Sequence, residues 1–234
     1  MTHLGDGSVV AVFPAAGSGQ RFGAAKNKLF SSLAGEPLWL HSLRRIGSRR
    51  EVGRVIVAVA ARDLSDFRDQ LAASNISLAV EFVIGGAERM DSVQIALDSV
   101  SEDSGVQWVS VHDAARPLVS DEDLDRIFSA VQETGAALLA TPVSGTLKRE
   151  MGEGNQIETV DRRRIWVALT PQVFRLGLLK LAYSKHNGCP ATDDAQLVER
   201  LGHEVQLVHG SADNLKITFP EDLSIAEAIL SRNQ

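Results

Sequence analysis

The sequence predicts an α/β fold with a mainly parallel β-sheet covered by helices on both faces. Two observations carry this prediction. Short apolar, β-branched runs alternate with segments of helical periodicity along most of the 234 residues. The chain is also 44% hydrophobic and 23% charged, which is typical of a globular protein with a sizeable core. We expect one domain over residues 1–234.

Each predicted strand is a short apolar run bounded by polar or turn residues. Six strands are expected from these runs: Val9–Phe13, Arg54–Val59, Ala79–Val83, Trp108–Val111, Ala136–Ala140 and Val205–Val208. Between and after them we expect helices at Leu38–Ile46, Asp63–Ala73, Met90–Val100, Asp121–Gln132, Phe174–His186, Asp193–Leu201 and Pro220–Leu230. In parallel sheets of this kind, ligands bind at the carboxyl ends of the strands.

The alternation of strands and helices is interrupted at residues 141–164. Thr146–Glu150 and Ile157–Asp161 are two extended pieces around a turn rich in Gly and Asn, which is typical of a β-hairpin. A two-stranded hairpin alone is marginally stable in water. We therefore expect this hairpin to rest on the remainder of the chain or on a second subunit.

Composition limits the classes of function. A net charge of −6 argues against nucleic-acid or membrane binding through bulk charge, and no apolar run approaches membrane-spanning length. The single cysteine, Cys189, excludes an intrachain disulfide. We see no signal peptide at the N-terminus. These observations favour a cytoplasmic protein that binds neither nucleic acid nor membrane.

The most informative segment is the turn after the first strand, Pro14–Arg21, with Lys28 just beyond it. Gly17 and Gly19 allow backbone N–H groups to approach an anion, and Arg21 and Lys28 add positive charge. The spacing matches neither a Walker A loop nor the usual dinucleotide fingerprint. We predict that this turn binds phosphates, and a purely structural turn is the alternative.

A second cluster follows the third predicted strand. Gly85 and Gly86 would let a flat base lie against the backbone, and Arg89 and Ser92 could contact ribose or phosphate. An ordinary turn into a helix with a charged first turn explains the same residues equally well.

A third cluster follows the strand Trp108–Val111. Asp113 lies at the carboxyl end of that strand, where one carboxylate together with phosphate oxygens suffices to bind Mg²⁺. Arg116 is a possible bidentate phosphate partner, and we interpret His112 as a structural histidine. Farther along, Lys216 lies between apolar neighbours, which favours an inward-pointing side chain.

Five motifs, in this order, resemble the 2-C-methyl-D-erythritol 4-phosphate cytidylyltransferase family over nearly the whole chain. They are Pro14-Ala15-Ala16-Gly17-x-Gly19-x-Arg21, Gly86-x-x-Arg89-x-Asp91-Ser92-Val93, His112-Asp113-Ala114-Ala115-Arg116-Pro117, Ala168-Leu169-Thr170-Pro171-Gln172 and Ala212-Asp213-Asn214-x-Lys216. The resemblance implies a Rossmann-like nucleotidyltransferase sheet of GT-A type with a protruding β-hairpin arm. It also implies transfer of the cytidylyl group of CTP to methylerythritol phosphate, with release of pyrophosphate.

The resemblance further implies a homodimer in which the arm at about residues 141–164 reaches the partner's active site. Arg21 and Lys28 would be catalytic, stabilising the triphosphate and the α-phosphorus, and Asp113 would bind Mg²⁺. CTP would be held by Ala15, Ala16, Gly17, Gly86, Arg89 and Ser92. The methylerythritol phosphate would be held by Arg116, Thr146, Arg162, Thr170 and Lys216, some of them from the second subunit.

The proposed chemistry agrees with the residue types. The attacking phosphate monoester is already anionic near neutral pH, so the protein must position two polyanions and neutralise their charge rather than supply a base. One departure from the family concerns Asn27-Lys28-Leu29, where the family usually has Pro-Lys-Gln. The backbone φ that proline would fix is lost there, and Lys26 is a second candidate for the lysine role.

Three alternative functions are open at this point. A ribitol 5-phosphate cytidylyltransferase would share the first loop and the Asp-x-x-Arg-Pro pattern. A nicotinamide oxidoreductase is disfavoured by the glycine spacing and by the missing ribose-binding acid. A non-catalytic nucleotide sensor would bind CTP without turnover. Whether Asp213 is a second metal ligand is equally open.

Overall fold

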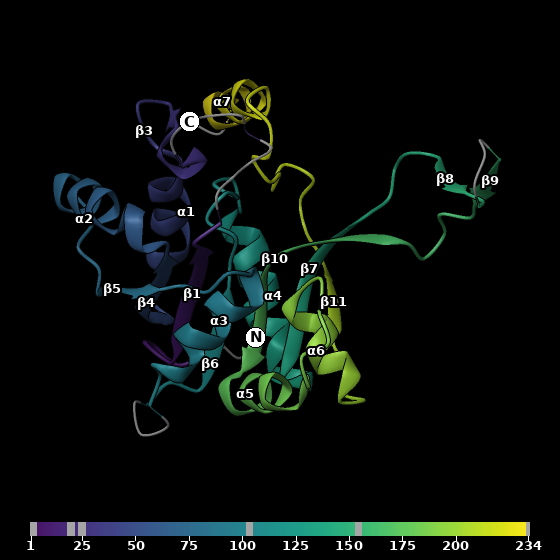
Figure 1. Cartoon of the computed structure of the whole chain (residues 1–234), viewed down its shortest axis with the longest axis horizontal. Coiled ribbons are helices and arrows are strands. Elements are labelled where there is room, and N and C mark those ends of the chain that lie inside the picture. Colours follow the sequence, from purple (N-terminus) through teal and green to yellow (C-terminus); the bar gives the residue numbers. More distant parts are fainter. Residues whose placement is uncertain (1–3, 18–21, 23–26, 102–104, 153–155, 233–234) are drawn as a thin grey trace.

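A computed structural model describes residues 4–17, 22, 27–101, 105–152 and 156–232. Seven strands form one twisted sheet in the order β11-β7-β10-β6-β1-β4-β5 (Figure 1). All neighbouring strands in this sheet are parallel except that β10 runs antiparallel to both β6 and β7. Their bounds are β1 Val9–Ala15, β4 Val52–Val59, β5 Val80–Ile84, β6 Trp108–Val111, β7 Ala136–Pro142, β10 Trp166–Arg175 and β11 Gln206–His209.

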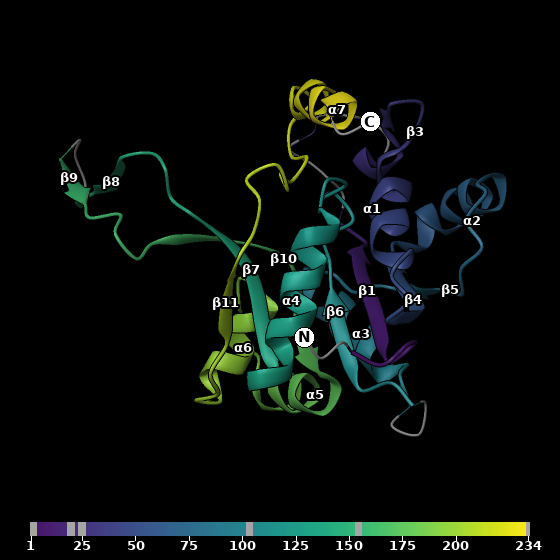
Figure 2. The same ribbon diagram turned by 180° about the vertical axis from the view of Figure 1, so that it is seen from behind.

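Helices cover both faces of this sheet (Figures 1 and 2). One face packs against α3 (Arg89–Asp98), α5 (Leu176–Lys185) and α6 (Asp194–Arg200). The other packs against α1 (Leu38–Gly47) and α4 (Asp121–Thr134). The remaining short elements are β2 (Ser32–Leu33), β3 (Glu36–Pro37), α2 (Leu64–Ala73), α7 (Asp222–Arg232) and the 3-10 helices η2 (Lys28–Phe30) and η3 (Ala61–Asp63).

The continuous apolar run of β1 follows from burial on both faces. Val10 and Val12 belong to the core on the α3 side, whereas Ala11 and Phe13 belong to the core on the α1 side. Because side chains alternate along a strand, a strand covered on both faces needs apolar residues at every position. None of the helices among the described residues is long and apolar enough to span a membrane.

The predicted elements are confirmed with shifts of a few residues, and one strand of the seven-stranded sheet was missed, as was the short pair β2 and β3. Strand β10 was not predicted, and the helix expected over Phe174–His186 starts at Leu176 because Phe174 and Arg175 still pair with β6. Pro171 in the middle of β10 conceals the strand in the sequence, since proline has no N–H to give to a ladder. The pairing with β7 is irregular between Ala168 and Gln172, around this proline.

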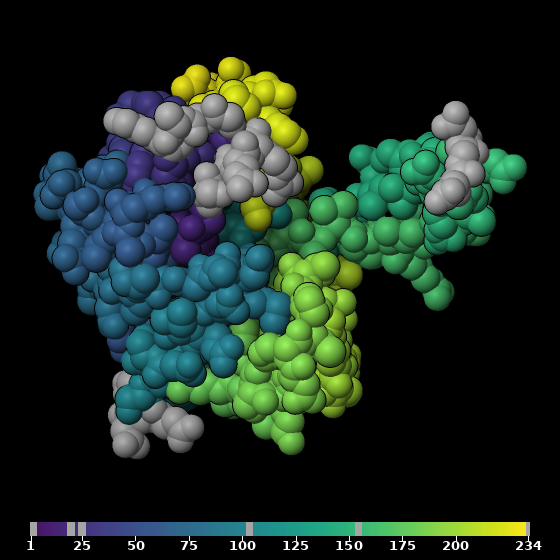
Figure 3. Space-filling model, viewed as in Figure 1, coloured from purple at the N-terminus to yellow at the C-terminus, as the bar shows by residue number. Residues whose placement is uncertain are grey.

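The hairpin predicted within residues 141–164 is confirmed. Strands β8 (Leu147–Glu150) and β9 (Ile157–Val160) pair antiparallel and form a separate small sheet. This hairpin, which we call the arm together with its connections at residues 143–165, projects from the body of the molecule (Figure 3). Ile157, at its end, is 63% exposed. Among the described residues, the arm therefore has no hydrophobic core of its own.

Because strands β1, β4, β5 and β6 are parallel, their carboxyl ends lie along the same edge of the sheet. The loops after β1, β5 and β6 leave from the carboxyl ends of these strands. Because Gln172 pairs with Val111, the antiparallel β10 brings Thr170 alongside the loop that follows β6. Three predicted motifs and the Thr170 segment are thereby gathered at the edge where ligands bind in such folds.

We predict that Phe67→Ala will destabilise the protein by about 3–5 kcal/mol in urea unfolding. Phe67, on α2, is completely buried and makes edge-to-face contacts with Phe30 and Trp39, so the deletion leaves a cavity under α1 and α2. Leu181→Ala, at a position that is 48% exposed on α5, is the control and should change the free energy of unfolding by about 0.5 kcal/mol or less.

Candidate active site

A cavity of about 310 Å³ opens at the carboxyl edge of the sheet. The loop after β1, the loop between β5 and α3, and the loop after β6 each form one of its walls, and Lys28 and Lys216 add positive charge. The residues that line it are Pro14, Ala15, Ala16, Gly17, Lys28, Leu29, Gly86, Ala87, Glu88, Arg89, Ser92, Asp113, Ala114, Ala115 and Lys216. The three motifs predicted from the sequence therefore share one cavity.

Gly85 allows two of these walls to meet. A Cβ at this position would lie 2.7 Å from the Cβ of Ala16 and 2.7 Å from the Oγ of Ser92, closer than carbon and oxygen atoms can pack. At Gly86 a Cβ would collide with Asp91, whose side chain accepts a hydrogen bond from the backbone N–H of Glu88 at the start of α3. Both glycines are thus required by the protein's own packing, in addition to any space they leave for a ligand.

Asp113 is the electrostatic centre of the site. Its Oδ2 lies 2.8 Å from Nζ of Lys216 and 3.5 Å from Nε of Arg116, and its Oδ1 lies 3.3 Å from Nε of Arg89. Burial alone would raise the pKa of this carboxyl, but the Coulombic attraction of Arg89, Lys216 and Arg116 holds the pKa well below its ordinary value. Asp113 is therefore an ionised, buried carboxylate in the wall of a positively charged cavity.

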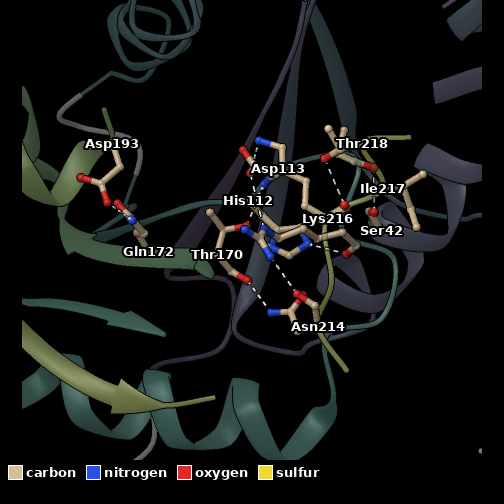
Figure 4. A network of polar contacts seen from close by, with 12 residues as sticks. Ser42, His112, Asp113, Thr170, Gln172, Asp193, Asn214, Lys216, Ile217 and Thr218 are labelled. Carbon is tan, nitrogen blue, oxygen red and sulfur yellow. Dashed lines mark hydrogen bonds and ion pairs between the residues drawn. The ribbon is translucent and has the colours of Figure 1, made fainter. Parts of the chain in front are cut away.

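A network of hydrogen bonds holds this ion cluster in place (Figure 4). The Thr170 hydroxyl accepts from the backbone N–H of Asp113 at 3.0 Å and contacts Nδ1 of His112 at 3.2 Å. Asn214, which is completely buried, donates to the carbonyl of Thr170, and its own carbonyl accepts from Arg116. β10, the loop after β6 and the segment before α7 are thus tied together behind Asp113.

His112 is a structural residue, as the sequence analysis predicted. Its ring is completely buried, its Nε2 lies 2.9 Å from the carbonyl oxygen of Arg116, and Phe13 packs edge-on against it. Burial, together with the nearby charges of Arg116 and Lys216, lowers the pKa of His112 to about 4. His112 is therefore neutral at pH 7 and does not line the cavity.

Asn27 stands where the family that the sequence resembles usually has proline, and its backbone adopts a conformation that proline would also allow. Its φ of −57° lies in the range that proline would fix. The side-chain oxygen accepts from the N–H of Leu29, and the side-chain amide donates to Asp63 at 2.9 Å. Lys28, presented by this turn, donates from Nζ to the carbonyl of Ile217 at 2.7 Å and lines the cavity. Lys26 lies outside the described residues, and so do Gly19 and Arg21.

A second, smaller cavity of about 230 Å³ adjoins the first and shares Arg89, Asp113 and Lys216 with it. Its own wall comes from β10 and from the start of α6. It is lined in addition by Arg116, Ala168, Leu169, Thr170, Gln172, Thr192 and Asp193. Two ligands occupying these adjoining cavities would meet at Asp113 and its cations.

Two predicted site residues lie apart from both cavities. Thr146 and Arg162 flank the hairpin of the arm, where the Arg162 guanidinium donates to the carbonyl of Ser144. Arg163 and Arg164, which follow Arg162, are exposed. Asp213 is absent from the linings of both cavities and pairs instead with Arg232 of α7.

The sequence analysis did not predict the buried ion pair between Arg89 and Asp194. Nη1 of Arg89 lies 2.8 Å from Oδ2 of Asp194, which is completely buried at the start of α6, and the hydroxyl of Tyr183 donates to Oδ1 of the same carboxylate. It also missed the role of Gln172, which joins β10 to α6 through Asp193 and the N–H of Ala195. Acidic residues at a helix start usually indicate only a cap, so no local signal distinguishes Asp194.

Comparisons with known proteins identify the relatives of this chain. The family model of IspD, 2-C-methyl-D-erythritol 4-phosphate cytidylyltransferase, matches residues 9–232. A protein of that name from Rhodopirellula baltica is 54% identical, over 96% of this chain and 95% of its own length. One from Bacillus velezensis is 45% identical, over 94% of this chain and 95% of its own length.

Solved structures show the same fold. The 2-C-methyl-D-erythritol 4-phosphate cytidylyltransferase of Thermus thermophilus is similar with a TM-score of 0.75 and 35% identity, over 95% of this chain and 98% of its own. The 4-diphosphocytidyl-2C-methyl-D-erythritol synthase of Anaerococcus prevotii gives a TM-score of 0.82 at 27% identity, over 96% and 98% of the two chains.

Asn27→Ala should destabilise the protein by about 1–2 kcal/mol, because it removes both side-chain hydrogen bonds of the turn that presents Lys28. We expect kcat/KM for CTP to fall several-fold as well, measured at a temperature where the variant is fully folded. Asn27→Pro, which fixes a compatible φ, should recover most of the activity. Equal kcat/KM in wild type and Asn27→Ala would contradict the positioning of Lys28 by this residue.

The low pKa of His112 predicts acid sensitivity of the ligand-free protein in EDTA. The unfolded chain takes up a proton on this histidine below about pH 6.5, whereas the folded protein resists protonation down to about pH 4. Stability is therefore lost as pH falls through this interval, by about 2 kcal/mol between pH 7 and pH 5. His112→Gln should lose less free energy of unfolding over the same interval, as measured in urea. The pKa of Asp113 is lowered, so this carboxyl titrates below the interval. Equal losses in wild type and His112→Gln would refute the assignment of this pH dependence to His112.

Proposed function

Because the chain belongs to the 2-C-methyl-D-erythritol 4-phosphate cytidylyltransferase (IspD) family, we propose that the larger cavity binds CTP and that the smaller one binds the acceptor phosphate. The enzyme transfers the cytidylyl group of CTP to 2-C-methyl-D-erythritol 4-phosphate in the non-mevalonate isoprenoid pathway, giving 4-(cytidine 5′-diphospho)-2-C-methyl-D-erythritol and pyrophosphate. The observation that carries the assignment of cavities is their common wall at Asp113, Arg89 and Lys216.

The wall formed by the β1 and β5 loops suits a nucleotide. Backbone at Ala15, Ala16 and Gly17 and at Gly86 borders the cavity without long side chains, so a base and ribose can lie close to the main chain. The Ser92 hydroxyl is the neighbouring polar group. In this proposal these residues, together with Arg89, hold CTP.

Charge neutralisation is the main task of the remaining residues. Lys28 lines the nucleotide cavity, and in our proposal it acts with Arg21 on the triphosphate and the α-phosphorus. The acceptor phosphate would be held by Arg116, Thr170 and Lys216. The attacking group is an anionic phosphate oxygen, so positioning and electrostatic stabilisation account for the catalysis that these side chains supply.

A magnesium ion fits the chemistry of Asp113. The carboxylate is ionised, lines the cavity and is the kind of hard oxygen ligand that Mg²⁺ shares with phosphate oxygens. No cluster of three or more acidic, histidine or cysteine ligands occurs among the described residues, which agrees with a site completed by the nucleotide. When bound there, the ion would neutralise charge on the phosphates of CTP. Asp113 would exchange part of its contact with Lys216 for the metal.

The arm supports a homodimer. It projects away from its own body (Figure 3), exposes Ile157, and carries Thr146 and Arg162 beside its hairpin, apart from both cavities of its own chain. We propose that it reaches the acceptor cavity of a second copy, and that Thr146 and Arg162 contact the acceptor there. The remaining elements of this proposal are one nucleotidyltransferase domain over residues 1–234 and a cytoplasmic location.

The family assignment overturns two of the alternative functions. A nicotinamide oxidoreductase and a non-catalytic sensor disagree with relatives that are cytidylyltransferases over nearly their full length. The same comparisons favour methylerythritol phosphate over ribitol 5-phosphate as the acceptor.

Pyrophosphate release measured with CTP and Mg²⁺ tests the function. We expect turnover with 2-C-methyl-D-erythritol 4-phosphate and none with ribitol 5-phosphate. Asp113→Asn should lower kcat by at least about 100-fold, since it removes the proposed metal ligand, while its fold, checked by circular dichroism, is retained. Turnover with ribitol 5-phosphate alone, or an active Asp113→Asn enzyme, would refute the proposal.

Mixing two inactive variants tests the contribution of the arm. Lys216→Ala damages the body of the site and Arg162→Ala damages the arm, so each homodimer should be nearly inactive. If the arm acts in the partner's site, each heterodimer contains one intact site, and a mixture should recover roughly a quarter of wild-type activity after subunit exchange. No recovery in a mixture that has demonstrably exchanged subunits would show that each arm serves its own chain.

A further inference from the structure

The carboxylate of Asp194 joins three helices on one face of the sheet. It lies at the start of α6, accepts the hydroxyl hydrogen bond of Tyr183 from α5 at 2.6 Å, and pairs with Arg89 at the start of α3 at 2.8 Å. Asp194 is completely buried and Tyr183 is 3% exposed. Neither residue is among those lining the two cavities.

Packing alone does not account for a buried carboxylate of this kind. Removing two charges from water is costly, and buried ion pairs are often replaceable by apolar residues without loss of stability. The contacts of the Asp194–Arg89 pair point instead to a role in the site. Arg89 is the link, since its guanidinium contacts Asp194 on one side and Asp113 on the other.

The two contacts of Arg89 differ in kind. Nη1 forms an ion pair with Oδ2 of Asp194 at 2.8 Å, whereas Nε donates a hydrogen bond to Oδ1 of Asp113 at 3.3 Å. Tyr183 donates its hydroxyl hydrogen to Oδ1 of Asp194 and so fixes the orientation of that carboxylate. Arg89 is therefore held by Asp194 on one side while it stabilises the charge of Asp113 on the other.

The charge balance at the site depends on Asp194. Three cations, Arg89, Arg116 and Lys216, meet the two carboxylates of Asp113 and Asp194. Without the charge of Asp194, the same three cations would face Asp113 alone. The cavity would then attract a free nucleotide more strongly, and it would repel a divalent cation more strongly.

We propose that Asp194, oriented by Tyr183, is a positioning residue of the cytidylyl transfer: it holds Arg89 and takes up part of its charge, so that Asp113 stays available to a divalent cation. The proposal rests on the proposed role of Asp113 as the metal ligand. It assigns a function to a residue that contacts neither substrate.

The test compares Asp194→Asn with Asp123→Asn. Asp123 is a matched control because it is also a completely buried carboxylate that pairs with an arginine, Arg126, but it lies on α4, away from both cavities. Three quantities are measured on the full-length enzyme. They are the Mg²⁺ concentration for half-maximal rate at saturating CTP and acceptor, the dissociation constant of CTP in EDTA by calorimetry, and the melting temperature.

Asp194→Asn should raise the Mg²⁺ concentration for half-maximal rate on the order of tenfold, and it should tighten CTP binding in EDTA several-fold. Asp123→Asn should lower the melting temperature without changing either quantity. If Asp194→Asn changes the melting temperature alone, as the control does, the residue is merely structural and the proposal is wrong.

Tyr183→Phe provides a second variant that keeps all charges. It should shift the Mg²⁺ requirement in the same direction by a smaller factor, because Asp194 loses its orientation but not its charge. If Asp194→Asn does not fold, an unchanged Mg²⁺ requirement in Tyr183→Phe overturns the proposal.

Calorimetry of CTP with and without Mg²⁺ on Asp113→Asn separates the positioning role of Asp194 from the metal role of Asp113. If Mg²⁺ strengthens CTP binding to this variant as it does in wild type, the metal role of Asp113 fails instead.

Discussion

The site depends on the attraction between the Asp113 carboxylate and three cations from distant parts of the chain. Arg89 comes from α3, Arg116 from the loop after β6, and Lys216 from the segment before α7. Three positive charges so close together would repel one another strongly in a partly buried site. Asp113 offsets that repulsion. The Thr170 hydroxyl, which accepts from the backbone N–H of Asp113, and the Asn214 side-chain amide, which donates to the carbonyl of Thr170, fix where it stands. A positive cavity can therefore exist before any phosphate arrives.

The common wall of the two cavities links this interaction to the chemistry. Transfer between two phosphates requires that two polyanions approach within bonding distance, and their mutual repulsion is the main obstacle. Arg89 and Lys216 border both cavities, so in the proposed arrangement the same charges would act on both reactants. The protein supplies a fixed arrangement of opposite charge rather than a proton acceptor, in agreement with a neutral, buried His112 that lies outside the cavity.

Local patterns in the sequence predicted most of the sheet and the centre of the site. The run Val9–Phe13 indicated a strand buried on both faces, and the position of Asp113 after a strand indicated a ligand-binding carboxylate. Two features had no local signal. Strand β10 contains Pro171, which weakens a strand prediction, although the irregular pairing with β7 accommodates it. The pairing of Asp194 with Arg89 joins residues far apart in the chain, so only the folded arrangement reveals it.

The arm is inserted between β7 and β10, two consecutive strands of the main sheet. Strands β7 and β10 are antiparallel neighbours, and Trp166 already pairs with Pro142 where the chain leaves and rejoins the sheet. The hydrogen-bonded ladder is therefore closed before the arm departs, and the entropy of closing a loop changes only slowly with its length. Insertions, deletions and exchanges within residues 143–165 would leave the register of the sheet and the nucleotide cavity unchanged. In the proposed dimer, selection would thus alter recognition of the acceptor, and the choice of subunit partner, independently of recognition of the nucleotide.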